Sequence, residues 1–520
     1  MHLVRLVTSL CGLSSAFGVL NAASIASGSS PVEIRCAGCH PKEVQAYSRS
    51  AMARALRTPG GQPNGSFQHL YSKTTFTISE DSTGVLQRFV RPGETAEQHV
   101  AFAIGSGNHA VGYLVRIGDH LFQSPLCYYT QSGSWGMAPG YEFDPHPDFS
   151  RPVPLTCLLC HSGRPEALEG TLNSYRRRAF SSEGITCERC HGPTEEHLRR
   201  PVPGSIVNPA GLTGPERDSV CEQCHLAGEV RIVNPGKKLT DYVPGERLED
   251  TLTIYVRAQP PSGQIKVVSH VEQLALSACA RMSGGKLWCG TCHNPHQTIS
   301  RPAEYFRDRC LGCHAAKLDH RHAAADRDCV GCHMPRKPTS DGGHTIFTDH
   351  RIASRPEVPS VSSDVVDLTA WREPEAQFRD RNLGLALADF SMQKKSAPQM
   401  VQAFRLLYRA EKTSPADPEV LTALGSLLFI AQDTEEAEKR YRQAVALKPD
   451  SAPFQVNLAA ALLKEGRNKE AQLCLERALR LDPFIESGVQ LLGRIYRASG
   501  EKEKAETLEA GYLAAMGYKR

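Results

Sequence analysis

Fourteen cysteines of this chain fall into seven copies of the pentapeptide C-x-x-C-H. Seven copies among 520 residues with 18 cysteines are far beyond coincidence. The spacing is the attachment signature of c-type haem, in which two thiols bond to one haem and the next imidazole reaches the iron. Each pentapeptide therefore predicts one haem c, seven in all. The expected thioether residues are Cys36, Cys39, Cys157, Cys160, Cys187, Cys190, Cys221, Cys224, Cys289, Cys292, Cys310, Cys313, Cys329 and Cys332.

The histidine that closes each pentapeptide is the expected proximal iron ligand. Structural zinc is an alternative, but zinc does not require a histidine directly after every second cysteine. A thioredoxin-like redox site needs one C-x-x-C in a βαβ context rather than seven copies. The predicted proximal ligands are His40, His161, His191, His225, His293, His314 and His333.

The first 26 residues favour export. Arg5 precedes an apolar stretch from Leu6 to Leu20, and small residues follow up to Ala26, which is typical of a cleaved secretory signal. A single-pass anchor is the alternative, although the stretch is shorter than the roughly 20 residues that a bilayer demands. We expect a periplasmic or cell-envelope protein, in an oxidising compartment, that associates with membranes only indirectly.

The remaining chain divides into a heptahaem domain (27–355), a linker rich in proline and serine (356–377) and a repeat domain (378–520). Short β-branched and aromatic runs between residues 65 and 145, separated by glycine, proline and aspartate, predict a small β-rich insert. Elsewhere the haem domain is expected to hold short helices and little regular structure, because porphyrin replaces much of the aliphatic core. The expected fold class is therefore mainly α.

The repeat domain has a period of 34 residues, the register of the tetratricopeptide repeat. Small residues at equivalent positions let the two helices of each unit approach closely, and a proline stops each second helix. Such arrays present a groove, so we expect the domain to dock a redox partner protein or a second copy, and its removal to leave the haem domain intact. The aligned residues are Ser391, Gly425, Ala459 and Gly493, then Ala403, Ala437, Ala471 and Ala505, then Ala410, Ala444 and Ala478, and finally Pro415, Pro449 and Pro483.

Each iron needs a sixth ligand or keeps an open position. Further histidines of the mature chain all precede Arg355, which favours ligand duty for most of them, since surface histidines would be scattered. They are His69, His99, His109, His120, His146, His197, His270, His296, His320, His322, His344 and His350.

Three motif contexts resemble the cytochrome c-554 type of multihaem cytochrome, a distant relative of hydroxylamine oxidoreductase and pentahaem nitrite reductase. They are GITCERCHGPTEEH, KLWCGTCHNPH, and DCVGCHMPRK followed by HTIFTDH, and the resemblance spans about Cys36 to His350. It implies His197 and His350 as distal ligands of neighbouring haems, with His296 and His109 next. Where relatives often place a histidine, this chain has Met52, either a thioether ligand of the first haem or a packing residue.

Uniform attachment sites and abundant histidine favour an electron relay through low-spin haems. The alternative is an oxidoreductase acting on a small nitrogen or sulfur compound, such as nitrite, hydroxylamine or tetrathionate, at one open haem. For that reaction Tyr128, Tyr129, Trp135 and Tyr141 could shape a pocket in which Arg116 attracts an anion. The sequence leaves open whether the protein is an enzyme.

Charge excludes one class of partner. Because 60 Lys and Arg nearly balance 56 Asp and Glu, for a formal charge of +4, nucleic acid is not expected to bind. Two propionates on each of seven haems would change +4 to −10 with ferrous iron, so the docking of partners should depend on salt. Cys127 and Cys279 have no role in this scheme, and Cys474 falls in a repeat helix.

Overall fold

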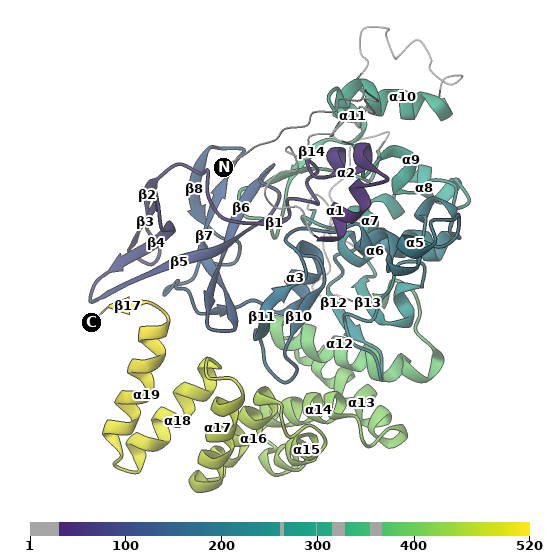
Figure 1. The fold of residues 1–520 in the computed structure, drawn as a ribbon. Helices are drawn as coiled ribbons and strands as arrows, with labels where there is room; N and C mark the ends of the chain where they lie inside the picture. The colour runs from purple at the N-terminus through teal and green to yellow at the C-terminus, as the bar shows by residue number, and fades with distance from the viewer. Residues whose placement is uncertain (1–30, 260–264, 298, 315–327, 354–366, 520) are drawn as a thin grey trace, which may run out of the picture.

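A computed structural model describes residues 31–259, 265–297, 299–314, 328–353 and 367–519. An antiparallel β-sheet and a group of short helices lie beside each other, and a helical solenoid runs along both (Figure 1). The predicted signal segment, the histidines at 320 and 322 and the first half of the predicted linker (356–366) lie outside the described residues. None of the helices in these ranges is long and apolar enough to cross a bilayer.

The sheet is a meander in which successive strands are neighbours. Ten strands belong to it within the described residues. In order they are β2 (Gly65–His69), β3 (Thr74–Asp81), β4 (Gly84–Arg91), β5 (Glu94–Ile104), β6 (Ala110–Ile117), β7 (His120–Tyr129) and β8 (Ser134–Met137). Three short strands join its sides, namely β1 (Leu56–Arg57) and β17 (Tyr518–Lys519) along β5 and β9 (Arg151–Pro152) along β7.

The sheet has its own aromatic core, so the expectation of little regular structure in the haem domain was wrong. Phe76 and Phe89 are fully buried, with ring centres 6.1 Å apart, and Phe89 stacks on Phe149 at 5.9 Å. Tyr113 and Tyr129 are 1% exposed in the same cluster. The predicted insert did not reveal the extent of the sheet, because β1, β9 and β17 pair with it from outside residues 65–145.

Short helices carry the seven pentapeptides. Those that contain motif residues are α1 (Pro31–Ala37), α3 (Leu155–His161), α4 (Glu188–His191), α6 (Gly214–His225), α9 (Cys289–Cys292), α10 (Pro302–His314) and α11 (Cys329–His333). Between them lie α2 (Pro41–Tyr47), α5 (Glu195–Arg199), α7 (His270–Ala275), α8 (Ala278–Met282) and the 3-10 turns Pro209–Gly211 and Leu248–Asp250.

Three small antiparallel sheets lie among these helices within the described residues. They comprise β10 (Pro165–Ala167) with β11 (Tyr175–Phe180), β14 (Arg336–Pro338) with β15 (Ile346–Thr348), and β12 (Val230–Val233) with β13 (Leu252–Arg257) and β16 (Leu368–Ala370).

The end of the predicted linker is not a linker. β16 pairs with β13, and the Arg372 side chain donates to the Glu222 carboxylate at 2.9 Å inside the fourth pentapeptide. Trp371 Nε1 donates to the same carboxylate at 3.1 Å. The pairing was not predictable because its partner strand lies more than a hundred residues away.

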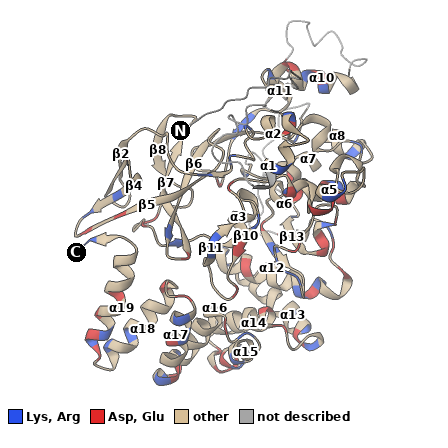
Figure 2. Cartoon of the chain, in the orientation of Figure 1, with Lys and Arg blue, Asp and Glu red and all other residues tan. Residues whose placement is uncertain are grey.

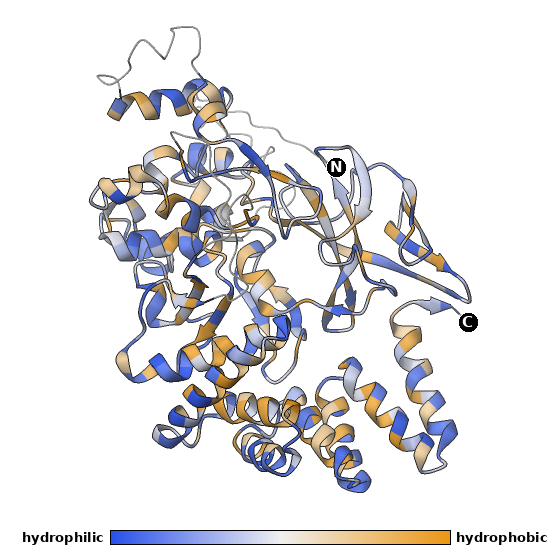
Figure 3. Cartoon of the chain, turned by 180° about the vertical axis from the view of Figure 1, so that it is seen from behind, coloured by the Kyte–Doolittle hydropathy of each residue, from blue (hydrophilic) through white to orange (hydrophobic). Residues whose placement is uncertain are grey.

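The predicted helical solenoid is confirmed. Its small aligned residues are buried, with Ser391, Ala403, Ala437 and Ala471 all fully enclosed, and a Cβ on Gly425 would lie 2.7 Å from the Tyr441 ring. Hydrophobic and hydrophilic residues alternate along the helices as paired amphipathic helices require (Figure 3). The helices are α12 (Arg379–Lys394), α13 (Ala397–Thr413), α14 (Pro418–Ile430), α15 (Thr434–Leu447), α16 (Ala452–Lys464), α17 (Asn468–Leu481), α18 (Glu486–Ala498) and α19 (Lys502–Ala515), preceded by the 3-10 turn Ala376–Phe378.

The solenoid is attached to the rest of the chain along its length. At its start, the Asn382 amide donates to Asn234 Oδ1 at 2.8 Å and to Thr253 Oγ1 at 2.9 Å. Further along, His120 and Asp482 form a buried pair at 3.1 Å. At its end, β17 adds to the edge of β5. The solenoid is therefore an integral part of the fold rather than a free module.

Candidate functional site

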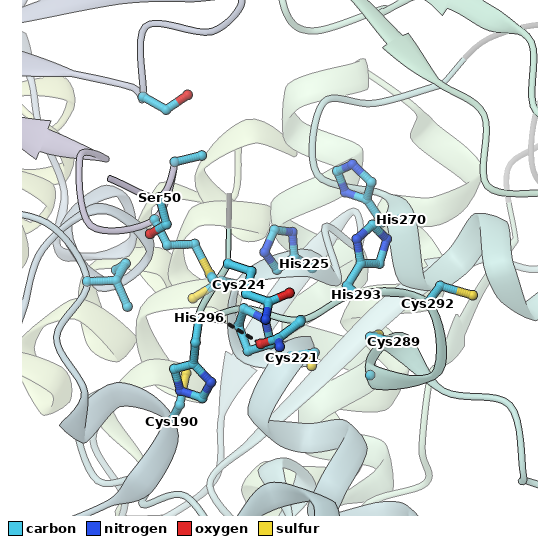
Figure 4. Close-up of a pocket in the computed structure, with 18 of the residues that line it drawn as sticks. Ser50, Cys190, Cys221, Cys224, His225, His270, Cys289, Cys292, His293 and His296 are labelled. Carbon is cyan, nitrogen blue, oxygen red and sulfur yellow. Dashed lines mark hydrogen bonds between the residues drawn. The ribbon is translucent and has the colours of Figure 1, made fainter. Parts of the chain in front are cut away.

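One large cavity collects the pentapeptides. Its volume is about 2910 Å³, well above the roughly 300–1,000 Å³ of ordinary small-molecule pockets. All seven closing histidines line it, as does every motif cysteine except Cys157 and Cys313. Motifs that are separated by up to three hundred residues of sequence thus face one space, where His225, His270 and His293 lie close together (Figure 4).

The backbone of each pentapeptide forms one helical turn. The His191 amide donates to the Cys187 carbonyl at 2.9 Å, and the same bond recurs from His293 to Cys289 at 2.9 Å and from His40 to Cys36 at 2.8 Å. Residues three apart on a helical turn share a face. The two thiols and the imidazole are thereby presented to the same side, as attachment and iron ligation both require.

Several imidazoles are held by their Nδ1 atoms. His191 Nδ1 contacts the Val207 carbonyl at 2.8 Å, His161 Nδ1 the Ala55 carbonyl at 3.2 Å and His333 Nδ1 the Ala353 carbonyl at 3.0 Å. A carbonyl oxygen only accepts, so each Nδ1 donates and carries the proton. With the proton on Nδ1, Nε2 of each ring carries the lone pair that can bind a metal, the arrangement usual for ligating histidines.

Three pairs of histidines face each other across the cavity with nearly parallel rings. Ring centres are 6.4 Å apart for His40 and His197 at an interplanar angle of 22°, and 5.8 Å apart for His191 and His296 at 20°. The third pair, His293 and His350, is 6.2 Å apart at 27°. An imidazole nitrogen lies about 2 Å from a bound metal and its ring centre about 1 Å behind, so two rings on one metal axis should be about 6 Å apart. The spacing fits one iron between each pair.

The five distal candidates all line the cavity. His197, His296 and His350 face proximal histidines, as described above. His109 accepts a hydrogen bond at Nδ1 from the Gln131 amide at 3.0 Å and stacks on Phe347 at 3.9 Å. The ring of His197 faces that of His40, and Met52 lines the same cavity. Iron ligation by His109 and Met52 stays a prediction.

Sequence reasoning left His270 outside the distal candidates. It lies in the cavity with its ring centre 5.3 Å from that of His225 and 4.7 Å from that of His350. No recognisable motif surrounds His270. The only sequence signal for a role in the site was that it is one of the histidines outside the pentapeptides.

The expectation that most spare histidines are ligands is too broad. His69 hydrogen-bonds to Ser72 Oγ and to the Glu142 carbonyl with its two ring nitrogens. His120 is bound to Asp482. Neither lines the cavity, and both serve the sheet and its contact with the solenoid.

The pentapeptide turns touch one another through their thiols. The neighbouring Cys224 lowers the pKa of Cys160 to about 6. The Cys224 thiol donates to the Leu159 carbonyl at 3.9 Å, and the Cys160 thiol donates to the Gln223 carbonyl at 3.8 Å. Cys221 donates to Cys289, and this bond, together with burial, raises the pKa of Cys221 far above its usual value. Turns two, four and five therefore form a continuous row.

Burial keeps the central imidazoles uncharged. Burial, followed by the neighbouring His350 and His225, lowers the pKa of His270 to about 3. Burial also lowers the pKa of His225. Neutral imidazole is the form that binds metals.

These lowered pKa values predict acid lability of the haem-free chain. A histidine in the unfolded chain has a pKa near 6.5. Between that pH and its lowered folded pKa, His270 is protonated in the unfolded chain and neutral in the folded one. The free energy of unfolding should fall by about 1 kcal/mol per pH unit for this group from pH 6.5 towards its folded pKa. Chain produced without haem attachment should lose its circular dichroism signal at higher pH than chain that carries the expected haems, because an imidazole bound to iron would not take up a proton. Equal acid midpoints would contradict the expectation.

The aromatic pocket proposed for an anion is not present. Tyr129 and Tyr141 are buried in the sheet core, and Tyr128 and Trp135 pack on it. Arg116 donates to backbone carbonyls, including that of Arg177 at 2.8 Å. None of these residues lines the cavity, which the insert reaches instead through Ser106, Asn108 and His109.

The remaining thiols are not paired in this structure. Cys127 is buried in β7, Cys279 lies on α8 beside the cavity, and Cys474 is half-buried on α17. Within the described residues, no three His, Cys, Asp or Glu side chains come together as a bare metal site.

Comparison with known proteins identifies the solenoid. A sequence model of the tetratricopeptide repeat matches residues 428–487. The TPR repeat-containing thioredoxin TTL4 of Arabidopsis thaliana is 35% identical over 91 residues, 17% of this chain and 13% of that protein. A crystal structure of MamA is similar over 26% of this chain and 80% of the MamA chain, with 19% sequence identity and a TM-score of 0.24. The C-terminal part of the chain is a tetratricopeptide repeat solenoid, a class that mediates protein–protein interaction.

The chain is also similar to a second protein. Multiheme cytochrome MtrA of Shewanella baltica is 23% identical over 180 residues, which are 31% of this chain and 53% of that protein. The chain thus spans about half the length of this relative and a smaller share of the plant relative.

Proposed function

We propose that the protein is an exported multihaem c-type cytochrome that relays electrons through seven covalently bound haems. The observation that carries the proposal is the set of three nearly parallel histidine pairs with ring centres about 6 Å apart, inside a cavity lined by all seven C-x-x-C-H turns. The similarity to a multihaem cytochrome supports it. The bound haems would supply reversible one-electron chemistry at iron.

The chain's own residues would attach the haems, orient them and hold successive haems close to one another. Cysteines of each turn would hold the macrocycle, and the carbonyls behind Nδ1 would fix the ligand rings. His296 follows His293 by three residues yet faces His191, so turns three and five share a ligand set. His197 likewise links turn three to turn one. Together with the row of touching thiols, these shared ligands support short distances between successive haems.

Mass spectrometry and electron paramagnetic resonance test the proposal together. The mature chain should carry the mass of seven haems and start near residue 27, and oxidised protein should show mainly low-spin ferric signals, because paired imidazoles leave no open position. Bare thiols, or zinc in place of haem, would refute the cofactor. A chain with seven haems that is mostly high-spin would refute the paired ligation.

One observation favours the oxidoreductase alternative. His161 is held by the Ala55 carbonyl. Among the described residues neither His161 nor His314 makes a ring contact with an imidazole or aromatic side chain, unlike His40, His191, His225 and His293. His161 is the better placed of the two, because its Nδ1 is held by a carbonyl. An open iron at this turn would give a single high-spin signal and turnover of nitrite, hydroxylamine or tetrathionate with a reduced dye. Absence of both would leave the relay as the function.

The solenoid and the destination complete the proposal. The tetratricopeptide repeats are proposed to dock a redox partner protein or a second copy on surfaces that the haem domain leaves free. The periplasmic or cell-envelope location is proposed from the signal-like residues 1–26.

A further inference from the structure

A hairpin beside the second pentapeptide concentrates positive charge. Arg176, Arg177 and Arg178 follow one another on β11, and all three are exposed, as is Arg164 at the start of the hairpin. Arginine and lysine gather along this strand in Figure 2. Arg176 lies 3.9 Å from Glu166. Among the described residues, no acidic side chain forms an ion pair with Arg164, Arg177 or Arg178.

A further arginine lies against the backbone of this strand. Arg116 of β6 donates from Nη2 to the Arg177 carbonyl at 2.8 Å and to the Arg176 carbonyl at 3.4 Å. Its one acidic neighbour, Asp119, is 3.5 Å away and exposed. Gathering like charges costs free energy in a fold, and among the described residues only Arg176 and Arg116 of these five arginines have a carboxylate within ion-pair distance.

The hairpin is fixed at both ends. At its base, directly after His161, the Gly163 amide donates to the Ser182 carbonyl at 3.0 Å and the Ser181 amide to the Arg164 carbonyl at 2.8 Å. At its tip, the Ala452 amide of the solenoid donates to the Gly170 carbonyl at 2.8 Å. Gly170 has φ +81°, and a Cβ there would lie 2.0 Å from the Asp450 carbonyl oxygen. The arginines are therefore presented on a rigid support.

We propose that the arginines of this hairpin form the docking surface for the acidic face of a redox partner protein, which exchanges electrons at the haem held by Cys157, Cys160 and His161. The inference rests on the proposed function. Its electrostatic basis is a contrast in sign: with seven haems the formal charge falls from +4 to −10 at ferrous iron, while this hairpin stays positive. An acidic partner would be repelled elsewhere and oriented towards the hairpin, which raises the rate of productive encounter.

The experiment uses the full haem-loaded chain and an acidic plant-type ferredoxin, chemically reduced, as the probe. Stopped-flow absorbance gives the second-order rate constant for haem reduction at increasing salt. We expect the rate constant to fall steeply with ionic strength, and at low salt to fall about tenfold in the double variant Arg176→Glu/Arg178→Glu. The control Arg405→Glu/Arg494→Glu makes the same change of charge at exposed sites on the solenoid and should stay within about twofold.

Two further measurements distinguish a failure of the proposed function from a failure of the docking inference. Haem content by mass and reduction by a small neutral reductant report the cofactors alone, so a chain that lacks haem refutes the proposed function rather than the docking surface. A haem-loaded hairpin variant that reacts with ferredoxin as fast as its control overturns the docking inference. The inference also fails if the variant loses binding to vesicles of phosphatidylcholine and phosphatidylglycerol while its reaction with ferredoxin is unchanged.

Discussion

Ending the chain at residue 377, which removes the whole solenoid, should unfold much of the remaining protein rather than leave a functional haem domain. The expectation reverses the sequence-based prediction that the repeat domain is separable. Ala386 and Phe390 of α12 are nearly fully buried against Val230 and Tyr255 of the β12–β13 sheet. Truncation would expose this apolar cluster to water.

Polar contacts across the boundary increase the cost of truncation. Removing Asn382 leaves the buried Asn234 and Thr253 without that partner. Removing Asp482 strips the buried His120 of its partner and leaves the Leu172 amide without an acceptor. Each buried polar group that loses its partner costs about 1–3 kcal/mol. Since domains are stable by only about 5–15 kcal/mol, these losses together with the exposed cluster should abolish cooperative unfolding.

Thermal unfolding followed by circular dichroism checks this prediction in graded steps. The truncated chain should aggregate or lack a cooperative transition. Asp482→Ala should lower the free energy of unfolding by about 2–4 kcal/mol, because a buried acceptor is lost. Asp450→Ala is the matched control, since its side chain is 81% exposed in the equivalent solenoid loop, and it should cost less than about 0.5 kcal/mol. A truncated chain with the intact transition of the full protein would show that the solenoid is separable after all.

The parts of the fold that the sequence predicts are those specified by local patterns. The pentapeptides and the 34-residue period are local patterns, and the buried Ala403 and Ala437 confirm the repeat register. The β-rich insert was predicted at residues 65–145, where β2 to β8 lie. The strands that join this sheet from outside the insert were not predicted, because β17 pairs non-locally: Tyr518 pairs with Ala96, more than four hundred residues away. Local patterns also suggested that Arg116 was free, whereas backbone carbonyls occupy it.

The ligand geometry shows a similar division. His197 and His296 sit in recognisable contexts next to pentapeptides, and the structure brings both rings opposite proximal histidines. His270 has no such context and enters the site only because α7 packs beside α6. A histidine with no motif around it carries no signal of a place in the site, so only the folded chain brings it there.

Replacing His197 by glycine should open one iron among seven. The centre of the His197 ring lies 6.4 Å from that of His40, which nominates His197 as the second ligand of the first proposed haem. Because Cys36 and Cys39 are untouched, the haem stays attached while its sixth position empties. Oxidised protein should then gain a high-spin ferric signal from one haem and lose the matching low-spin signal, measured by electron paramagnetic resonance.

Two controls make the His197→Gly result specific to this iron. His146 is exposed and does not line the cavity, so His146→Gly should leave every low-spin signal in place. Added free imidazole should enter the space left by the lost ring and restore the low-spin signal of His197→Gly, which a general disruption of the fold would not allow. A spectrum unchanged by the His197 substitution would mean that another ligand, with Met52 the first candidate, completes the first iron. If imidazole fails to restore the low-spin signal, the main role of His197 is structural. Its Nδ1 contact with Ser205 Oγ at 2.9 Å would then hold α5 in place.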